Sequence, residues 1–107
     1  MSFNPRRGDT LPLSITIRLD GSLYDLTGCT VKFSYQNLYN NHSGSMDGVV
    51  STDVDDTAEE KATATFTPSY TTFNIAGSYK YDIQVDDGSL RFTPSYGEFE
   101  VLEDITV

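Results

Sequence analysis

The sequence predicts an all-β protein in which antiparallel strands form two sheets packed face to face. Several short segments alternate apolar and polar residues, the period of two expected when one face of a strand is buried and the other is wet. Seven Tyr, six Phe and frequent turn residues are also typical of β proteins. Counting the segments gives about seven strands, and 107 residues suffice for a single domain with one core.

The clearest pattern lies in residues 76–101. Residues 79–85 place Tyr, Tyr, Ile and Val at every second position, which predicts a strand with one buried face. Asp87-Gly88 then predicts a two-residue type I′ turn, because both residues tolerate the positive φ angles that this turn needs. After a returning strand, residues 98–101 alternate again. The pairs expected in the hairpin are Asp86 with Ser89, Val85 with Leu90, Gln84 with Arg91 and Ile83 with Phe92.

A polar N-terminal arm is expected at residues 1–10, followed by a single β domain at residues 11–107. The first strand, 13–19, ends at Asp20-Gly21, which predicts a second two-residue turn. In that register Ile17 lies opposite Tyr24 and Ile15 lies opposite Leu26. The other strands expected before residue 76 are 23–26, 29–36, 62–67 and a short one at 49–54.

Three segments between the strands are expected to be irregular. Residues 37–48 are rich in Asn, Ser and Gly and predict a surface loop of the kind that often binds partners. Residues 53–60 predict a charged connection, and the only helical turn expected lies in residues 55–61. Residues 69–75 predict a segment that crosses one end of the core. The residues expected to cap the core from this segment are Tyr70, Phe73 and Ile75.

The formal net charge of −9 argues against nucleic acid as a partner, because binding to phosphates depends on Lys and Arg. No apolar run approaches the roughly 20 residues of a membrane-spanning helix, and residues 1–10 do not read as a signal peptide. We therefore expect no contact with a membrane. Cys29 is the single cysteine, so no intrachain disulfide is expected, and we interpret it as a small apolar group in a buried strand.

Neither a metal site nor a catalytic site is expected. Five carboxylates fall within residues 53–60, but their spacing matches no ordered calcium loop, so a solvated acidic connection is preferred to a cation site. His42, the single histidine, lies in the polar loop with Ser45 and Asp47, where no ordered partner for acid–base chemistry is expected. No cofactor is expected, and we interpret the chain as a protein without enzymatic activity. Arg7-Gly8-Asp9, a tripeptide that some integrin ligands present, is attributed to chance.

Two blocks of the sequence resemble the immunoglobulin-like domain at the N-terminus of phage baseplate upper proteins, a domain also found in other structural proteins of tailed phages. The first block starts at Arg7-Gly8-Asp9-Thr10 and continues through Asp25-Leu26-Thr27-Gly28 into a Val-containing strand. The second contains Gly77-Ser78-Tyr79, the Asp87-Gly88 turn and a return strand with Pro94. Together the blocks frame nearly the whole chain in the right order. The resemblance implies an immunoglobulin-like β-sandwich.

Baseplate upper proteins continue beyond this domain, so the resemblance implies for this chain a virion component built from the same domain. We expect a non-enzymatic structural protein of a tailed bacteriophage, located in the baseplate, tail or neck of the virion and made in the cytoplasm of the bacterial host. Its expected partners are other virion proteins and further copies of itself, in a homo-oligomer. The candidate interface residues are Arg6, Arg7, Tyr39, His42, Tyr70 and Tyr96.

The alternative is a carbohydrate-binding or host-surface adhesion module on the same fold. Fold alone does not decide between these functions, and Tyr at a surface rim can stack on sugars as well as bind proteins. This alternative predicts glycan binding that is lost when Tyr39 is replaced by Ala while the protein stays folded. An enzyme would instead require a pocket of convergent polar groups, which the sequence does not indicate.

Overall fold

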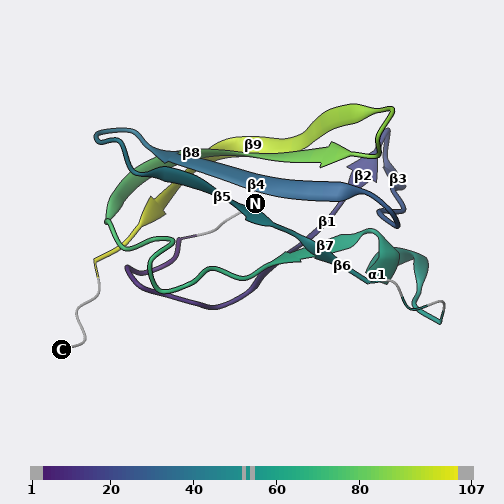
Figure 1. The fold of residues 1–107 in the computed structure, drawn as a ribbon, viewed down its shortest axis with the longest axis horizontal. Coiled ribbons are helices and arrows are strands. Elements are labelled where there is room, and N and C mark those ends of the chain that lie inside the picture. The colour runs from purple at the N-terminus through teal and green to yellow at the C-terminus, as the bar shows by residue number, and fades with distance from the viewer. Residues whose placement is uncertain (1–3, 52, 54, 104–107) are drawn as a thin grey trace.

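The computed structural model describes residues 4–51, 53 and 55–103. These residues form strands with one short helix, and every pair of named strands is antiparallel, which confirms the all-β class (Figure 1). The strands are β1 (Leu13–Thr16), β2 (Arg18–Leu19), β3 (Ser22–Leu23), β4 (Thr30–Asn37), β5 (Ser43–Asp47), β6 (Val49–Val50), β7 (Thr63–Phe66), β8 (Gly77–Asp86) and β9 (Arg91–Val101), and the helix is α1 (Ala58–Lys61).

The strands lie in two layers (Figure 1). One layer is a four-stranded sheet in the order β5-β4-β8-β9, and the other is a three-stranded sheet in the order β1-β7-β6. The short β2-β3 hairpin lies at one end, and β5 continues through Gly48 into β6, so the chain changes sheets at that edge. Buried apolar side chains of both layers form one core. The immunoglobulin-like topology stays a prediction from the sequence resemblance.

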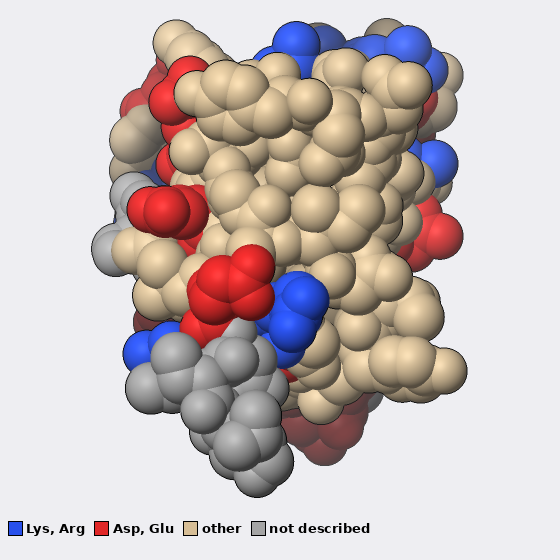
Figure 2. Space-filling model, turned by 90° about the vertical axis from the view of Figure 1, so that its left-hand side faces the viewer, with Lys and Arg blue, Asp and Glu red and all other residues tan. Residues whose placement is uncertain are grey.

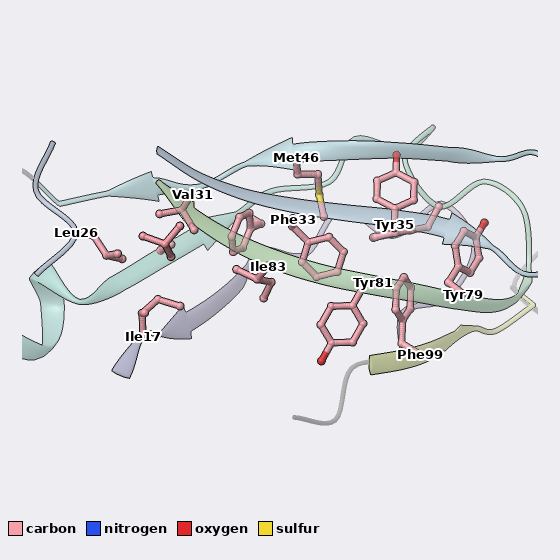
Figure 3. Packing of buried hydrophobic residues seen from close by; sticks show 14 of the residues in the cluster. Ile17, Leu26, Val31, Phe33, Tyr35, Met46, Tyr79, Tyr81, Ile83 and Phe99 are labelled. Atoms are coloured by element: carbon pink, nitrogen blue, oxygen red, sulfur yellow. The ribbon is translucent and has the colours of Figure 1, made fainter. Parts of the chain in front are cut away.

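The centre of the four-stranded sheet is the pair formed by β4 and β8, which stay in register over eight residue pairs. The predicted alternation is confirmed in both strands, since every second residue is buried. Phe99 and Val101 of β9 are also buried, as the pattern at residues 98–101 predicts. The inward apolar residues of the central pair are Val31, Phe33 and Tyr35 of β4 and Tyr79, Tyr81, Ile83 and Val85 of β8. All of them except Val85 are labelled in Figure 3.

Tyr35 and Tyr81 face each other across β4 and β8, and each also lies opposite a glycine of the neighbouring edge strand. A Cβ atom at Gly44 would lie 2.6 Å from the hydroxyl oxygen of Tyr35, and one at Gly97 would lie 3.4 Å from the ring of Tyr81. Each glycine therefore leaves room for the ring opposite it, and the ring covers the glycine backbone. Gly44, Tyr35, Tyr81 and Gly97 thus form one row across the four strands, and this row continues the core across the full width of the sheet.

Phe33 joins the two layers of the molecule. Its ring centroid lies 5.3 Å from that of Tyr81 in a stacked arrangement and 5.7 Å from that of Phe66, which belongs to the other sheet. Phe99 of β9 lies 6.1 Å away on an edge-to-face approach. Aromatic pairs in these geometries add to the stability that burial of the rings provides. Phe33 is fully buried, so its removal would leave a cavity between the sheets.

The β8–β9 hairpin has a four-residue loop, 87–90, so the predicted two-residue turn is wrong. Gly88 has a positive φ of 95° whereas Asp87 does not, and a type I′ turn needs both. The Asp87 carboxylate accepts hydrogen bonds from the backbone N–H groups of Ser89 and Leu90, which closes the wider loop. The observed pairs next to the loop are Asp86 with Arg91 and Val85 with Phe92.

A bulge in β9 shifts the pairing of β8 with β9 by one residue between Val85 and Ile83. Ile83 lies opposite Ser95, so the predicted pair of Ile83 with Phe92 is wrong. Pro94 lies in the irregular stretch, and it has no N–H group to donate to the ladder. The hairpin therefore accommodates the proline by adding one residue to β9.

The first hairpin agrees with the prediction at its turn. Asp20 and Gly21 have φ angles of 53° and 82°, as a type I′ turn requires. The Tyr24 N–H donates to the carbonyl oxygen of Ile17 at 3.1 Å, which confirms that predicted pair. Further from the turn the prediction is wrong, because the first strand divides after Thr16 and its first half pairs with β7. The observed contacts are Ile15 with Ala64 and Leu26 with Lys61.

Residues 43–47 form β5, so the surface loop predicted over residues 37–48 is wrong for that half and is restricted to residues 38–42. All five residues of β5 pair with β4, and Met46 is buried opposite Phe33. Ser and Gly have a low intrinsic preference for strands, and the pairing with β4 overrides it.

Other expectations are met in part. β7 lies within the strand predicted at 62–67, whereas the strand predicted at 49–54 is the two-residue β6, with residues 52 and 54 outside the described ones. Cys29 is half-buried and precedes β4, so its placement in a buried strand is wrong; partial burial raises the pKa of its thiol. Of the three residues expected to cap the core, Phe73 is buried but Tyr70 and Ile75 are exposed.

We expect Phe33→Ala to lower the free energy of unfolding by about 3–5 kcal/mol, because it removes a ring that packs against both sheets. Urea denaturation followed by tyrosine fluorescence would measure this loss. Phe33→Leu retains most of the side-chain volume and should cost clearly less. Equal losses for the two variants would contradict a cavity as the cause.

A second prediction concerns acid stability. Hydrogen bonds from the N–H groups of Leu90 and Ser89, and then from the Tyr24 hydroxyl, lower the pKa of Asp87. A carboxyl whose folded pKa lies below its unfolded value stabilises the fold above about pH 4, and the contribution is lost as the pH falls through the folded pKa. Urea titrations at a series of acidic pH values should therefore show a smaller loss of stability for Asp87→Asn than for the parent. Parallel losses in both proteins would disprove this role.

Candidate interaction surface

Two segments without charged residues meet at one end of the molecule. Residues 33–46 and 62–79 contain no Asp, Glu, Lys or Arg, in a chain where these make up 21% of the residues. They supply the loop 38–42 between β4 and β5 and the loop 67–76 between β7 and β8, both at the left of Figure 1. We call the surface formed by these two loops the end face. Figure 2 shows a broad uncharged area over the upper and right-hand part of this end of the molecule, with acidic and basic side chains below it and to its left.

The loop 38–42 is built on Asn37, which is 2% exposed. The side-chain oxygen of Asn37 accepts hydrogen bonds from the N–H groups of Tyr39 at 2.8 Å and Asn40 at 3.2 Å. Its own backbone N–H donates to the carbonyl oxygen of His42 at 2.8 Å. A short polar side chain that bonds to nearby backbone in this way favours a tight turn. The turn leaves Tyr39 outside the core, with 84% of its surface exposed.

His42 connects the two loops of the end face. Its Nε2 atom lies 2.8 Å from the carbonyl oxygen of Thr72, and a carbonyl can only accept, so Nε2 carries a hydrogen. Its ring lies near the rings of Tyr35 and Tyr79, with centroid distances of 6.0 and 6.1 Å. The expectation that His42 has no ordered partner is therefore wrong, because folding brings the second loop beside it. This bond holds the two loops in a fixed relation.

The loop 67–76 is held by its own side chains and by the core below it. Ser69 and Thr72 exchange hydrogen bonds, since each backbone N–H donates to an oxygen of the other residue. The Tyr79 hydroxyl donates to the carbonyl oxygen of Ile75 at 2.6 Å, and burial raises the pKa of this phenol, which favours the protonated form. Phe73 is buried beneath the loop, whereas Tyr70 is 73% exposed.

The N-terminal arm borders the end face and lies along the end of β9. The Arg6 side chain donates to the carbonyl oxygen of Glu103 at 3.1 Å, and the Arg7 side chain lies 3.7 Å from the Glu103 carboxylate. Both arginines are exposed, so these contacts contribute little to stability. The backbone bonds of the arm are Arg7 N–H to Leu102 O, Leu102 N–H to Pro5 O and Gly8 N–H to Phe73 O.

The structure brings together some of the six candidate interface residues. Tyr39, His42 and Tyr70 belong to the end face, and Arg6 and Arg7 lie at its border. Tyr96 lies elsewhere, on β9 opposite Asp82, where 77% of its surface is exposed. Two exposed apolar residues of the end face, Leu38 and Ile75, were not among the candidates. The two charge-free runs in the sequence are the signal that could have indicated them.

The acidic residues at 53–60 make local contacts. The Asp53 carboxylate accepts from the Asp55 N–H, and Thr57 with Glu60 forms a capping box at the start of α1 within the predicted helical turn. A hydrogen bond with Glu60 raises the pKa of Asp56. Among the described residues, no group of three or more His, Cys, Asp or Glu side chains is arranged to hold a metal ion.

The described part of the chain has no helix with the length and apolar character needed to cross a bilayer. Comparison with protein-family models and with curated proteins finds no match.

Proposed function

We propose that this chain is a non-enzymatic structural component of a tailed-bacteriophage virion, in the baseplate, tail or neck, and that it binds other virion proteins and further copies of itself. The sequence resemblance to the N-terminal domain of baseplate upper proteins supports the assignment to a virion. The end face is the observation that supports protein–protein interaction.

The composition of the end face suits contact with another protein. Its loops present Tyr39 and Tyr70 among Asn, Ser and Thr, with Leu38 and Ile75 partly exposed between them. Tyr offers a large and rigid contact area at a low cost in conformational entropy, and Ser and Asn provide adaptable hydrogen bonds, a combination found in antibody binding loops. Depletion of charge is also typical of the centre of a protein interface.

The rigidity of the loops supports the same function. His42 fixes one loop to the other, and the buried Asn37 fixes the turn that carries Tyr39. A surface that is already ordered loses less conformational entropy when a partner binds. The end face therefore suits the permanent contacts of an assembled particle.

Antibody labelling of particles from a lysate of the source culture, viewed by electron microscopy, tests the assignment to a virion. Label at the tail tip, baseplate or neck is the expected result. Unlabelled particles together with soluble protein in the lysate would overturn the assignment.

The end face itself can be tested by incorporation of tagged variants into particles. Tyr39→Ala and Tyr70→Ala should each reduce incorporation by about fivefold or more, since loss of a tyrosine that is a hot spot of an interface costs more than about 1 kcal/mol. Quantitative blotting of purified particles would measure this. Leu90→Ala is the control, because Leu90 is an exposed apolar residue in the β8–β9 loop at the opposite end. Incorporation equal to the parent for both tyrosine variants would disprove the role of the end face.

A second candidate function, carbohydrate binding, is favoured by a shallow groove on the outer face of the four-stranded sheet. Tyr96 borders the groove, because it lies directly opposite Asp82 across β8 and β9. Hydroxyl, amide and charged groups beside an exposed ring can hydrogen-bond to a sugar and stack on it. The outward side chains that line the groove are Ser34 and Gln36 of β4, Ser43 and Ser45 of β5, and Lys80 and Asp82 of β8.

If the groove binds glycans, Tyr96→Ala should abolish binding on a glycan array, whereas Tyr96→Phe should retain most of it because the ring remains. Tyr39→Ala tests the rim tyrosine named from the sequence in the same assay. Binding that survives Tyr96→Ala in a folded protein would exclude the groove as the site.

A further inference from the structure

The outer edge of β5 is open to a partner strand. β5 is the last strand on its side of the four-stranded sheet, since the chain continues from it into β6 of the other sheet. Residues 43–46 carry no charge and include no Pro, so the usual devices that protect an edge strand are missing from them. Such an edge is a template for the addition of another strand.

The hydrogen bonds between β4 and β5 show which backbone groups face outward. The Asn37 N–H donates to the carbonyl oxygen of His42, and the Gly48 N–H donates to that of Val31. In an antiparallel pair the hydrogen-bonded positions alternate with positions whose backbone groups point away. Gly44 and Met46 therefore face β4, and the N–H and carbonyl groups of Ser43, Ser45 and Asp47 point towards the open edge.

The opposite edge of the same sheet is protected. The arm covers the end of β9, because the Leu102 N–H donates to the carbonyl oxygen of Pro5 and Arg6 forms a parallel bridge with Leu102. Earlier in β9 the bulge near Pro94 interrupts the edge, and Glu98 adds a charge. In the other sheet, β6 has two residues, and β1 lies between Pro12 and Arg18. β5 is thus the longest edge strand without a bulge or a proline in the described part of the chain.

We propose that β5 pairs with β5 of a second copy of this chain, as antiparallel strands about a two-fold axis at Ser45. This inference rests on the proposed function, because it names one partner of the interaction module. Ser45 then lies opposite its own counterpart, and Ser43 lies opposite Asp47 of the second copy. The two four-stranded sheets become one continuous sheet.

The charges along β5 allow a second copy at this edge. Two chains of net charge −9 repel each other, so they can associate only where carboxylates do not meet. In the proposed register each Asp47 faces a serine, and Lys32 of the same chain lies 4.0 Å from the Asp47 carboxylate. No pair of like charges is placed in direct opposition along β5.

The pairing leaves the end face of each copy free. The loop 38–42 leads directly into β5, so antiparallel strands carry the two end faces to opposite ends of the dimer. The dimer is therefore able to join two further virion proteins. A single short strand pair buries little surface, which indicates a weak contact that is strengthened by the high local concentration in a particle.

Cysteine cross-linking of the purified full chain detects such a contact even when it is weak. In a Cys29→Ser background, Ser45→Cys should form a disulfide-linked dimer under mild oxidation, because opposed residues at a hydrogen-bonded antiparallel position have Cα atoms about 5.5 Å apart. Ser34→Cys is the matched control, since Ser34 is the partner of Ser45 on the inner strand β4 and points to the same face of the sheet. Absence of the Ser45→Cys dimer, or equal dimer from Ser34→Cys, would overturn the proposal.

The register is tested by mixing two other variants in the same background. Ser43→Cys and Asp47→Cys should cross-link with each other but not each with itself. Addition of Ser45→Lys to both should reduce the cross-linked fraction at least about tenfold, because it places two like charges in opposition. Self-linking of each single variant, or no effect of Ser45→Lys, would exclude this pairing.

Failure of the pairing and failure of the proposed function are distinguishable. If the cross-links are absent but Tyr39→Ala still blocks incorporation into particles, the end face stands and β5 pairing is wrong. If the cross-links form but Tyr39→Ala and Tyr70→Ala incorporate like the parent, the pairing stands and the role of the end face is wrong.

Discussion

Packing of aromatic rings between the two layers is the interaction on which the rest of the structure depends. Phe33 contacts rings of both sheets, and the same cluster continues along β4 and β8 to Tyr35 and Tyr79. Those two tyrosines lie against Phe73 and His42, the residues that support the loops of the end face. The surface loops are therefore an extension of the core, and their shape depends on the same buried rings that hold the sheets together.

The sequence predicts β4 and β8 well because alternation over eight or more residues reflects burial of one strand face, which is a local and repeated signal. It fails where one side chain or one distant strand decides the result. The Asp87 carboxylate widens a loop that the dipeptide Asp-Gly does not distinguish from a tight turn. β5 is missed because its Ser and Gly residues become a strand only through pairing with β4.

Residue type identifies some residues of the end face from the sequence, but it does not show which contacts hold them together. Tyr39, His42 and Tyr70 stand out as aromatic residues in polar loops. The bond from His42 to the carbonyl oxygen of Thr72 involves a backbone atom thirty residues away, which no motif in the sequence describes. Residue type alone groups Tyr96 with them, but the register of β8 and β9 places it on the outer face of the sheet.

Because the buried Asn37 fixes the turn, the shape of the loop 38–42 does not depend on which side chains the loop presents. Its amide holds the N–H groups of Tyr39 and Asn40 through backbone contacts, which do not depend on the Tyr39 side chain. Natural variants could therefore exchange the residue at position 39 without loss of the turn, provided that Asn37 is kept. Divergence of binding specificity would then require few compensating changes in the core, so a family of such proteins could acquire new partners while the framework stays constant.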